Sequence, residues 1–102
     1  MATYYNLNEL GEPEATTLLK WNVKSVSAQD WLVAKTVIDG VIVSTMFLAI
    51  NHNPNRNGRP LLWETMVFGG PLDGEQLRYE TRQQAHAGHE AMCARVRAAS
   101  RE

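Results

Sequence analysis

The chain has 102 residues, a formal net charge of −1 and a pI near 6.3. With 44% hydrophobic and 21% charged residues, it has the composition of a single globular domain, residues 1–102, that buries a core without disulfides or metals. The near-neutral charge excludes a general attraction to nucleic acid or anionic lipid.

Cysteine usage and the apolar runs indicate the compartment. A single cysteine, Cys93, excludes an intrachain disulfide and fits a reducing environment. The first 15 residues lack the basic and apolar regions of a secretory signal, and the longest apolar run, residues 41–50, is too short to span a bilayer. We therefore expect a cytoplasmic protein without a membrane partner.

The N-terminal third gives weak signals. Residues 3–12 predict a short extended arm and a turn, because aromatic residues precede Gly11-Glu12-Pro13. Thr16 or Thr17 can then cap a short helix that ends near Asn22. The β-branched residues that follow leave an extended conformation open for this stretch.

A β-hairpin is predicted around Asp39-Gly40, which stands between two β-branched runs and suits a type I′ turn. The turn would pair, on one face, Ile38 with Val41, Thr36 with Val43, Ala34 with Thr45 and Leu32 with Phe47. The other face would carry Trp31, Val33, Val37, Ile42, Met46, Leu48 and Ile50, interrupted by Lys35 and Ser44. Because both faces are mostly apolar, either helices cover both or one packs on a second subunit. We expect a homodimer through one sheet face.

The remaining elements complete the predicted fold. A third strand over residues 61–68 follows the 51–60 loop, and residues 76–80 return as a polar edge strand after a Gly-rich loop at 69–74. Thr81 and Gln84 form a capping box for a C-terminal helix, whose apolar stripe is Ala85, Gly88, His89, Met92, Val96 and Ala99. The sequence thus predicts an α+β fold: a four-stranded antiparallel meander, the C-terminal helix on one face, and a short N-terminal helix.

Three residues of that helix have the spacing of weak metal-ligand candidates. His86, His89 and Cys93 follow one another at i, i+3 and i+7 and so share a narrow arc. Three ligands on one helix rarely meet at one ion without help from another element. The favoured interpretation places His89 in the helix–sheet seam, Cys93 in the core and His86 half exposed, with no metal or cofactor.

Glu64 alternates with Leu62, Met66 and Phe68. If that set faces the core, the carboxylate needs a partner, since an unpaired buried charge is costly. Arg78 on the returning strand is the best candidate, with His52 or His89 as alternatives, and a structural ion pair is the favoured role. If instead Trp63, Thr65 and Val67 form the buried face, Glu64 is solvated. The pattern leaves both arrangements open.

The loop at 51–60 contains His52, Arg56 and Arg59 among several asparagines. Such a loop can contact phosphates or RNA bases, although it is more often a solvated connection. The chain has no dinucleotide-binding, P-loop, nucleophile-elbow or Cys-x-x-Cys motif.

Five segments stand out together: VSTMFL at 43–48, His52-Asn53, PLLWETMVFGG at 60–70, RYET at 78–81 and AGHE at 87–90. In these segments the chain resembles a family of small proteins carried by bacteriophages and by phage-like regions of bacterial genomes. The resemblance spans about residues 18–97, and PLLWETMVFGG is its distinctive part. The 51–60 loop departs from the family's shorter, Gly-rich connection. The resemblance implies a phage context, in the host cytosol, and no particular activity.

These observations predict a small non-enzymatic phage accessory protein that binds a macromolecular partner. The partner would be a host factor, a defence component or a phage assembly protein, and the protein would act as an inhibitor in some of these cases. One alternative is a small metal-dependent hydrolase using Glu64, His52 and His89; another is an RNA- or DNA-binding module using the 51–60 loop. No catalytic residue is assigned, and the candidate binding residues are His52, Arg56, Arg59, Glu64, Arg78 and His89.

Overall fold

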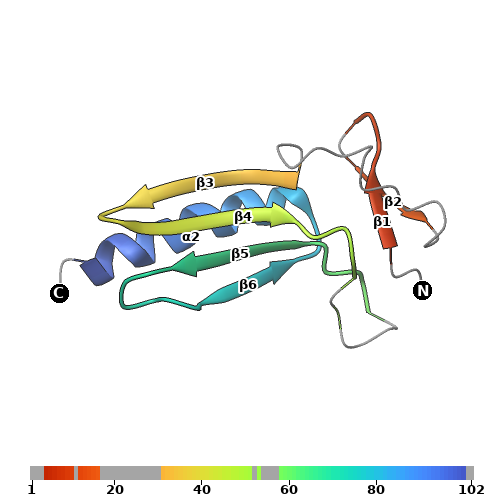
Figure 1. Ribbon diagram of the computed structural model, residues 1–102. Coiled ribbons are helices and arrows are strands. Elements are labelled where there is room, and N and C mark those ends of the chain that lie inside the picture. The colour runs from red at the N-terminus through yellow and green to blue at the C-terminus, as the bar shows by residue number, and fades with distance from the viewer. Residues whose placement is uncertain (1–3, 11, 17–30, 52, 54–57, 101–102) are drawn as a thin grey trace.

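A four-stranded antiparallel sheet, in the order β3-β4-β5-β6, lies against one long helix, and a separate two-stranded hairpin stands at one end (Figure 1). The computed structural model describes residues 4–10, 12–16, 31–51, 53 and 58–100. Its elements are β1 (Tyr4–Leu7), β2 (Pro13–Thr16), β3 (Leu32–Ile38), β4 (Val41–Phe47), β5 (Trp63–Phe68), β6 (Gln76–Tyr79) and α2 (Arg82–Ser100). The predicted α+β meander with its C-terminal helix is confirmed. The predicted N-terminal helix falls mainly on residues 17–22, outside the described residues.

The β3–β4 hairpin forms at the predicted turn. Asp39 and Gly40 both have positive φ angles, 48° and 79°, as a type I′ turn requires. The three predicted pairs nearest the turn are present, but Leu32 pairs with Met46 and not with Phe47. An irregularity between residues 32 and 34 takes up one residue of β3 and shifts the register beyond it.

This β-bulge corrects the predicted faces of β3. Trp31 and Val33 were expected on the face that carries Met46, but they pack against the core cluster that contains Phe47. The Trp31 and Phe47 rings meet edge to face, with centroids 6.4 Å apart. Leu32 takes the opposite face, beside Met46.

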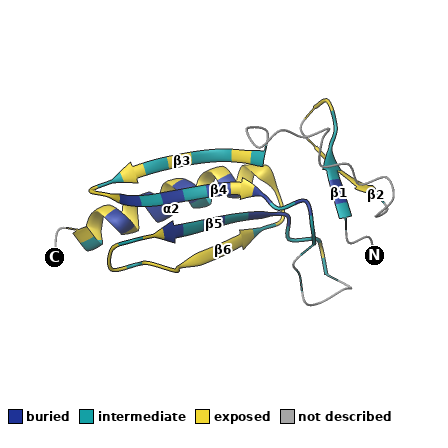
Figure 2. Ribbon diagram, viewed as in Figure 1, coloured by how far each residue is buried: buried dark blue, intermediate teal, exposed yellow. Residues whose placement is uncertain are grey.

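Strands β4 and β5 alternate strictly between the two faces of the sheet (Figure 2). Their buried residues, on the side of α2, are Val41, Val43, Thr45, Phe47, Trp63, Thr65 and Val67. Of the two arrangements left open for β5, the one that buries Trp63, Thr65 and Val67 is therefore correct.

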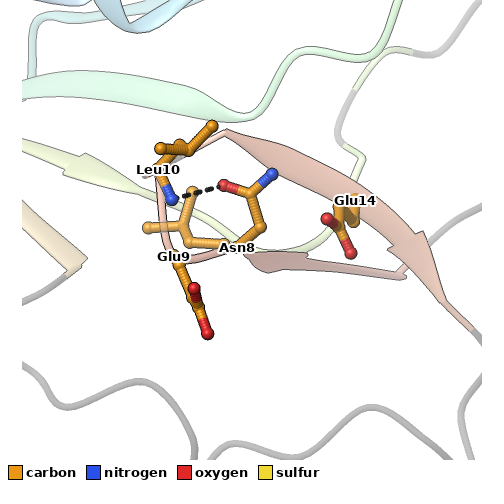
Figure 3. Close-up of a pocket in the computed structure, with 5 residues that line it drawn as sticks. Asn8, Glu9, Leu10 and Glu14 are labelled. Carbon is orange, nitrogen blue, oxygen red and sulfur yellow. Dashed lines mark hydrogen bonds between the residues drawn. The ribbon is translucent and has the colours of Figure 1, made fainter.

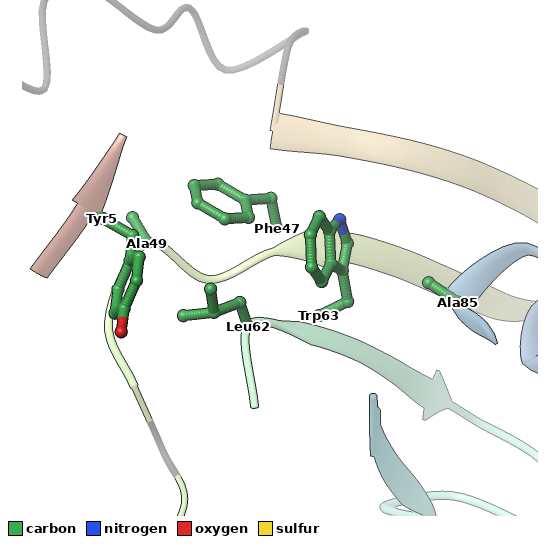
Figure 4. Close-up of a cluster of buried hydrophobic side chains, with 6 residues drawn as sticks. All are labelled: Tyr5, Phe47, Ala49, Leu62, Trp63 and Ala85. Atoms are coloured by element: carbon green, nitrogen blue, oxygen red, sulfur yellow. The ribbon is translucent and has the colours of Figure 1, made fainter. Parts of the chain in front are cut away.

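The core consists of two apolar clusters along α2. The first surrounds Trp63 and contains Tyr5, Phe47, Ala49, Leu62 and Ala85 (Figure 4). The second lies along the C-terminal half of the helix and contains Val41, Val43, Val67, Met92, Cys93 and Val96. Cys93 is therefore a small buried core residue, as predicted.

The N-terminal hairpin attaches to the first cluster. The sequence predicted an extended arm and a turn here, and the structure adds a second strand, β2, paired with β1. The Tyr5 amide donates a 2.8 Å hydrogen bond to the Ala49 carbonyl. Inside the hairpin, the Asn8 side-chain oxygen accepts from the Leu10 and Glu12 amides, both at 2.9 Å, which closes the turn.

The start of α2 is held by the predicted capping box. The Gln84 amide donates to the Thr81 hydroxyl at 3.0 Å, and the Gln84 side-chain oxygen accepts from the Thr81 amide at 3.3 Å. One turn later, Gly88 lets the helix approach β6 so closely that a methyl group there would overlap the Tyr79 phenol.

We expect Gly88→Ala to destabilise the protein by about 1–3 kcal/mol despite the higher helix propensity of alanine, because the Tyr79 ring must move. Urea unfolding measures this change. In a Tyr79→Ala background the same substitution should become neutral or stabilising, and an equal loss in both backgrounds would contradict the steric explanation.

Candidate functional site

A continuous chain of hydrogen-bonded side chains crosses the helix-covered side of the sheet. It runs through Thr36 on β3, His89 on α2, Thr45 on β4, Thr65 on β5 and Tyr79 on β6. His89 Nε2 lies 2.9 Å from the Thr36 hydroxyl, and His89 Nδ1 lies 2.7 Å from the Thr45 hydroxyl. The Tyr79 hydroxyl donates to the Thr65 hydroxyl at 3.0 Å. The chain thus links the helix to all four strands.

The pairing of the strands and the spacing of the helix bring these groups together. Thr45 and Thr65 lie directly opposite each other on adjacent strands, and their hydroxyls form a hydrogen bond. Helical spacing brings His89 over them, between the two apolar clusters. The sequence predicted His89 at the seam but missed the threonines. The available signal was a threonine at an inward position in each of two apolar strands.

One placement of the hydrogen atoms gives every hydroxyl in this series of hydrogen bonds a partner within the series. Tyr79 donates to Thr65, Thr65 to Thr45, and Thr45 to His89 Nδ1, which leaves the ring hydrogen on Nε2 to be donated to Thr36. In that arrangement His89 is the neutral Nε2–H tautomer, and both of its nitrogens are engaged.

The environment favours this neutral form. Desolvation lowers the pKa of His89 below its ordinary 6.5, an effect that Glu90 opposes and His86 reinforces. With 2% of its surface exposed, the imidazole is also closed to a substrate. In this position the imidazole serves as the hydrogen-bond partner of the Thr36 and Thr45 hydroxyls in the core.

The weak metal-ligand candidates do not converge. His86 is exposed, Cys93 is buried, and both nitrogens of His89 are already bonded to threonine hydroxyls. Within the described part of the chain, no three His, Cys, Asp or Glu side chains lie close enough together to hold a metal ion.

Glu64 lies on the other side of the sheet. Its carboxylate accepts a 2.9 Å hydrogen bond from Arg78 Nε on the neighbouring strand, so the predicted ion pair is present. Of the two arrangements that the pattern left open, the one with Glu64 on a core-facing side is excluded, because Glu64, Met66 and Phe68 point away from α2, whereas Leu62, which precedes β5, is buried in the first cluster. Glu64 and His89 are thus separated by the sheet. The His52 of the predicted hydrolase site lies outside the described residues.

The side of the sheet away from α2, here called the open face, carries six apolar side chains and five polar or charged ones. Its three cross-strand rows are Val37–Ile42–Phe68, Lys35–Ser44–Met66–Gln76 and Leu32–Met46–Glu64–Arg78. Leu32, Val37, Met46 and Phe68 are 36–62% exposed. Of the six large hydrophobic side chains that are exposed in the described structure, these four lie on the open face.

Two hollows lie at the N-terminal hairpin. One, of about 540 Å³, is lined by Leu7, Asn8, Glu9, Leu10 and Glu14 (Figure 3). The other, of about 380 Å³, lies where the hairpin meets the start of α2 and includes Leu10, Pro13, Trp63 and Arg82. Neither is lined by His89, Glu64 or Arg78.

The arginine-rich loop is described only in part. Arg59 is strongly exposed, with Glu80 4.0 Å away, whereas His52 and Arg56 lie outside the described residues. Of the six candidate binding residues, the structure brings together Glu64 and Arg78 alone among those it describes.

Comparison with family models, with curated proteins and with solved structures finds no match to this chain. Within the described residues, no helix combines the length and the apolar composition needed to cross a bilayer.

Because the folded pKa of His89 is lowered, the unfolded chain takes up its proton first as the pH falls, at about 6.5. The free energy of unfolding should therefore decrease as the pH drops from about 6.5 through the folded pKa. Urea unfolding between about pH 7.5 and 5 measures the slope, while carboxylates stay largely ionised. His89→Gln should reduce the dependence of the unfolding free energy on pH, whereas His86→Gln, the control at an exposed position, should leave it unchanged. A reduced slope with His86→Gln and an unchanged slope with His89→Gln would refute the assignment of the slope to His89.

We expect Thr45→Val to cost about 1–3 kcal/mol, since it leaves His89 Nδ1 without a donor and interrupts the chain to Thr65. The neighbouring control Ser44→Ala, on the open face, should cost less than about 0.5 kcal/mol. Equal effects of the two substitutions on the urea midpoint would show that the buried hydrogen bonds of Thr45 add no more to the stability than an exposed serine does.

Proposed function

We propose that this protein is a non-enzymatic binding protein that contacts a macromolecular partner through the open face of its sheet. One observation carries the proposal: four large apolar side chains on that face are 36–62% exposed, and two of them, Val37 and Phe68, lie in one row. Apolar side chains gathered on one flat surface favour protein contact, since binding removes them from water.

The chemistry of the described polar groups supports a role without catalysis. The best-placed titratable side chain, His89, is enclosed and fully hydrogen-bonded. The carboxylate of Glu64 is held by Arg78, on the other side of the sheet. A shared cleft for an acid and a base, which the hydrolase alternative needs, does not arise from these two groups.

The charge of the open face supports a protein partner over nucleic acid. Glu64 and Arg78 neutralise each other, and Lys35 is the other charged residue in its rows. Nucleic-acid binding depends on several cations aimed at phosphates, and this face lacks such a cluster. The phage context, as an accessory or inhibitor protein in the host cytosol, belongs to the same proposal and rests on the resemblance of residues 60–70 to phage-borne proteins.

The test is affinity capture of the tagged protein from bacterial host lysate, with nuclease treatment, a salt wash and a second copy carrying a different tag. We expect capture of a nuclease-resistant protein, and its loss with Phe68→Asp, since the charge would be buried on binding. Leu77→Asp is the matched control: Leu77 is 46% exposed, against 48% for Phe68, but its strand position places it on the α2 side.

Capture that persists unchanged with Phe68→Asp, or that Leu77→Asp abolishes equally, would refute binding through the open face. Thermal unfolding of both variants checks that the fold is intact. Both side chains are half exposed, so their replacement should affect stability to a similar, small extent.

A further inference from the structure

We infer that the occupant of the open face is a second copy of this chain, packed sheet on sheet about a two-fold axis that runs nearly parallel to the strands between β4 and β5. The inference rests on the proposed function, because it names the partner at the same surface. It is carried by the size of the face, by its matching shapes and by its charges.

The size of the face is just sufficient for a dimer. The four strands lie about 4.8 Å apart and are four to seven residues long, about 20 Å on average, which gives a surface of ~400 Å² in plan for each copy. Side-chain relief raises the accessible area removed from both copies to ~1,000 Å², the lower limit of specific interfaces. The structure therefore implies a weak, concentration-dependent dimer.

The shapes match under this symmetry. Rotation about the axis places each residue of β4 over the partner's copy of its own β5 neighbour, because the two strands exchange sides while each row keeps its height. Ile42 then meets the partner subunit's Phe68, and the small Ser44 faces the partner subunit's Met66. Packed sheets lie about 10 Å apart with strands rotated by about 30°, which keeps the central rows opposed.

The charges are compatible as well. Lys35, at the β3 edge, meets the partner subunit's Gln76 and stays far from the second Lys35. In the third row, Met46 meets the partner subunit's Glu64 and Leu32 meets the partner subunit's Arg78, and each Glu64 carboxylate keeps the Arg78 guanidinium of its own subunit that already neutralises it. No like charges face each other across the axis, and the paired carboxylate avoids the cost of an isolated buried charge.

Sedimentation equilibrium over about 1–300 µM tests the inference, a range that brackets weak interfaces of this size. We expect the mass to rise from 11.5 kDa toward twice that value with concentration. Phe68→Asp should remain monomeric, whereas the α2-side control Leu77→Asp should dimerise like the unmodified protein.

A charge pair tests the symmetry itself. Ile42→Glu alone and Phe68→Lys alone should each fail to dimerise, because each buries two unpaired charges. An equimolar mixture should form a heterodimer, in which one glutamate meets one lysine and the other contact stays Ile42 against Phe68. A mixture that stays monomeric overturns the proposed arrangement.

The outcomes separate the two proposals. If the unmodified protein is monomeric throughout but Phe68→Asp still abolishes capture of another protein, self-association is overturned and the binding function stands. If the protein is monomeric and capture does not depend on Phe68, both are overturned. A dimer broken by Leu77→Asp and not by Phe68→Asp would move the interface to the other side of the sheet and refute the inference.

Discussion

The two hydrogen bonds of the His89 imidazole determine how the helix sits on the sheet. An imidazole that is 2% exposed requires partners for its nitrogens, and the structure supplies Thr36 and Thr45 from adjacent strands. A shift of the helix by one turn would take both imidazole nitrogens away from Thr36 and Thr45 and leave them without these partners. The apolar clusters on either side tolerate small displacements better than this polar centre does. The helix therefore has one favourable position, and the Thr45–Thr65 pair ties the strand register to it.

This arrangement divides the molecule into two chemically different sides. Under the helix, the His89 imidazole and the hydroxyls of Thr45 and Thr65 are enclosed and hydrogen-bonded to one another, so they are not available to react with solutes. On the open face, apolar side chains remain in contact with water while the charged residues there are few and partly paired. This division is the basis of the binding function proposed above, and with the low net charge of the chain any affinity at the open face would come mainly from short-range apolar contact.

Local signals predicted much of the fold. The Asp39-Gly40 turn and the Thr81 capping box each depend on a few neighbouring residues, so both were visible in the sequence and both are present. The β-bulge beside Val33 was not predictable, because no glycine marks it and it is selected by packing against Phe47. The hydrogen-bonded chain was missed for a different reason. Its members are far apart in sequence, and an inward threonine looks like an ordinary β-branched strand residue until the helix is docked over it.

Cys93 has a practical consequence of its own. It is the chain's single thiol, and it lies on the sheet-facing side of α2, buried in the second apolar cluster. A thiol reagent can reach it only when the helix lifts from the sheet or the whole domain unfolds. The labelling rate of the unmodified protein therefore reports the population of opened molecules, or the rate of opening when the reagent reacts faster than the helix closes, without an introduced probe.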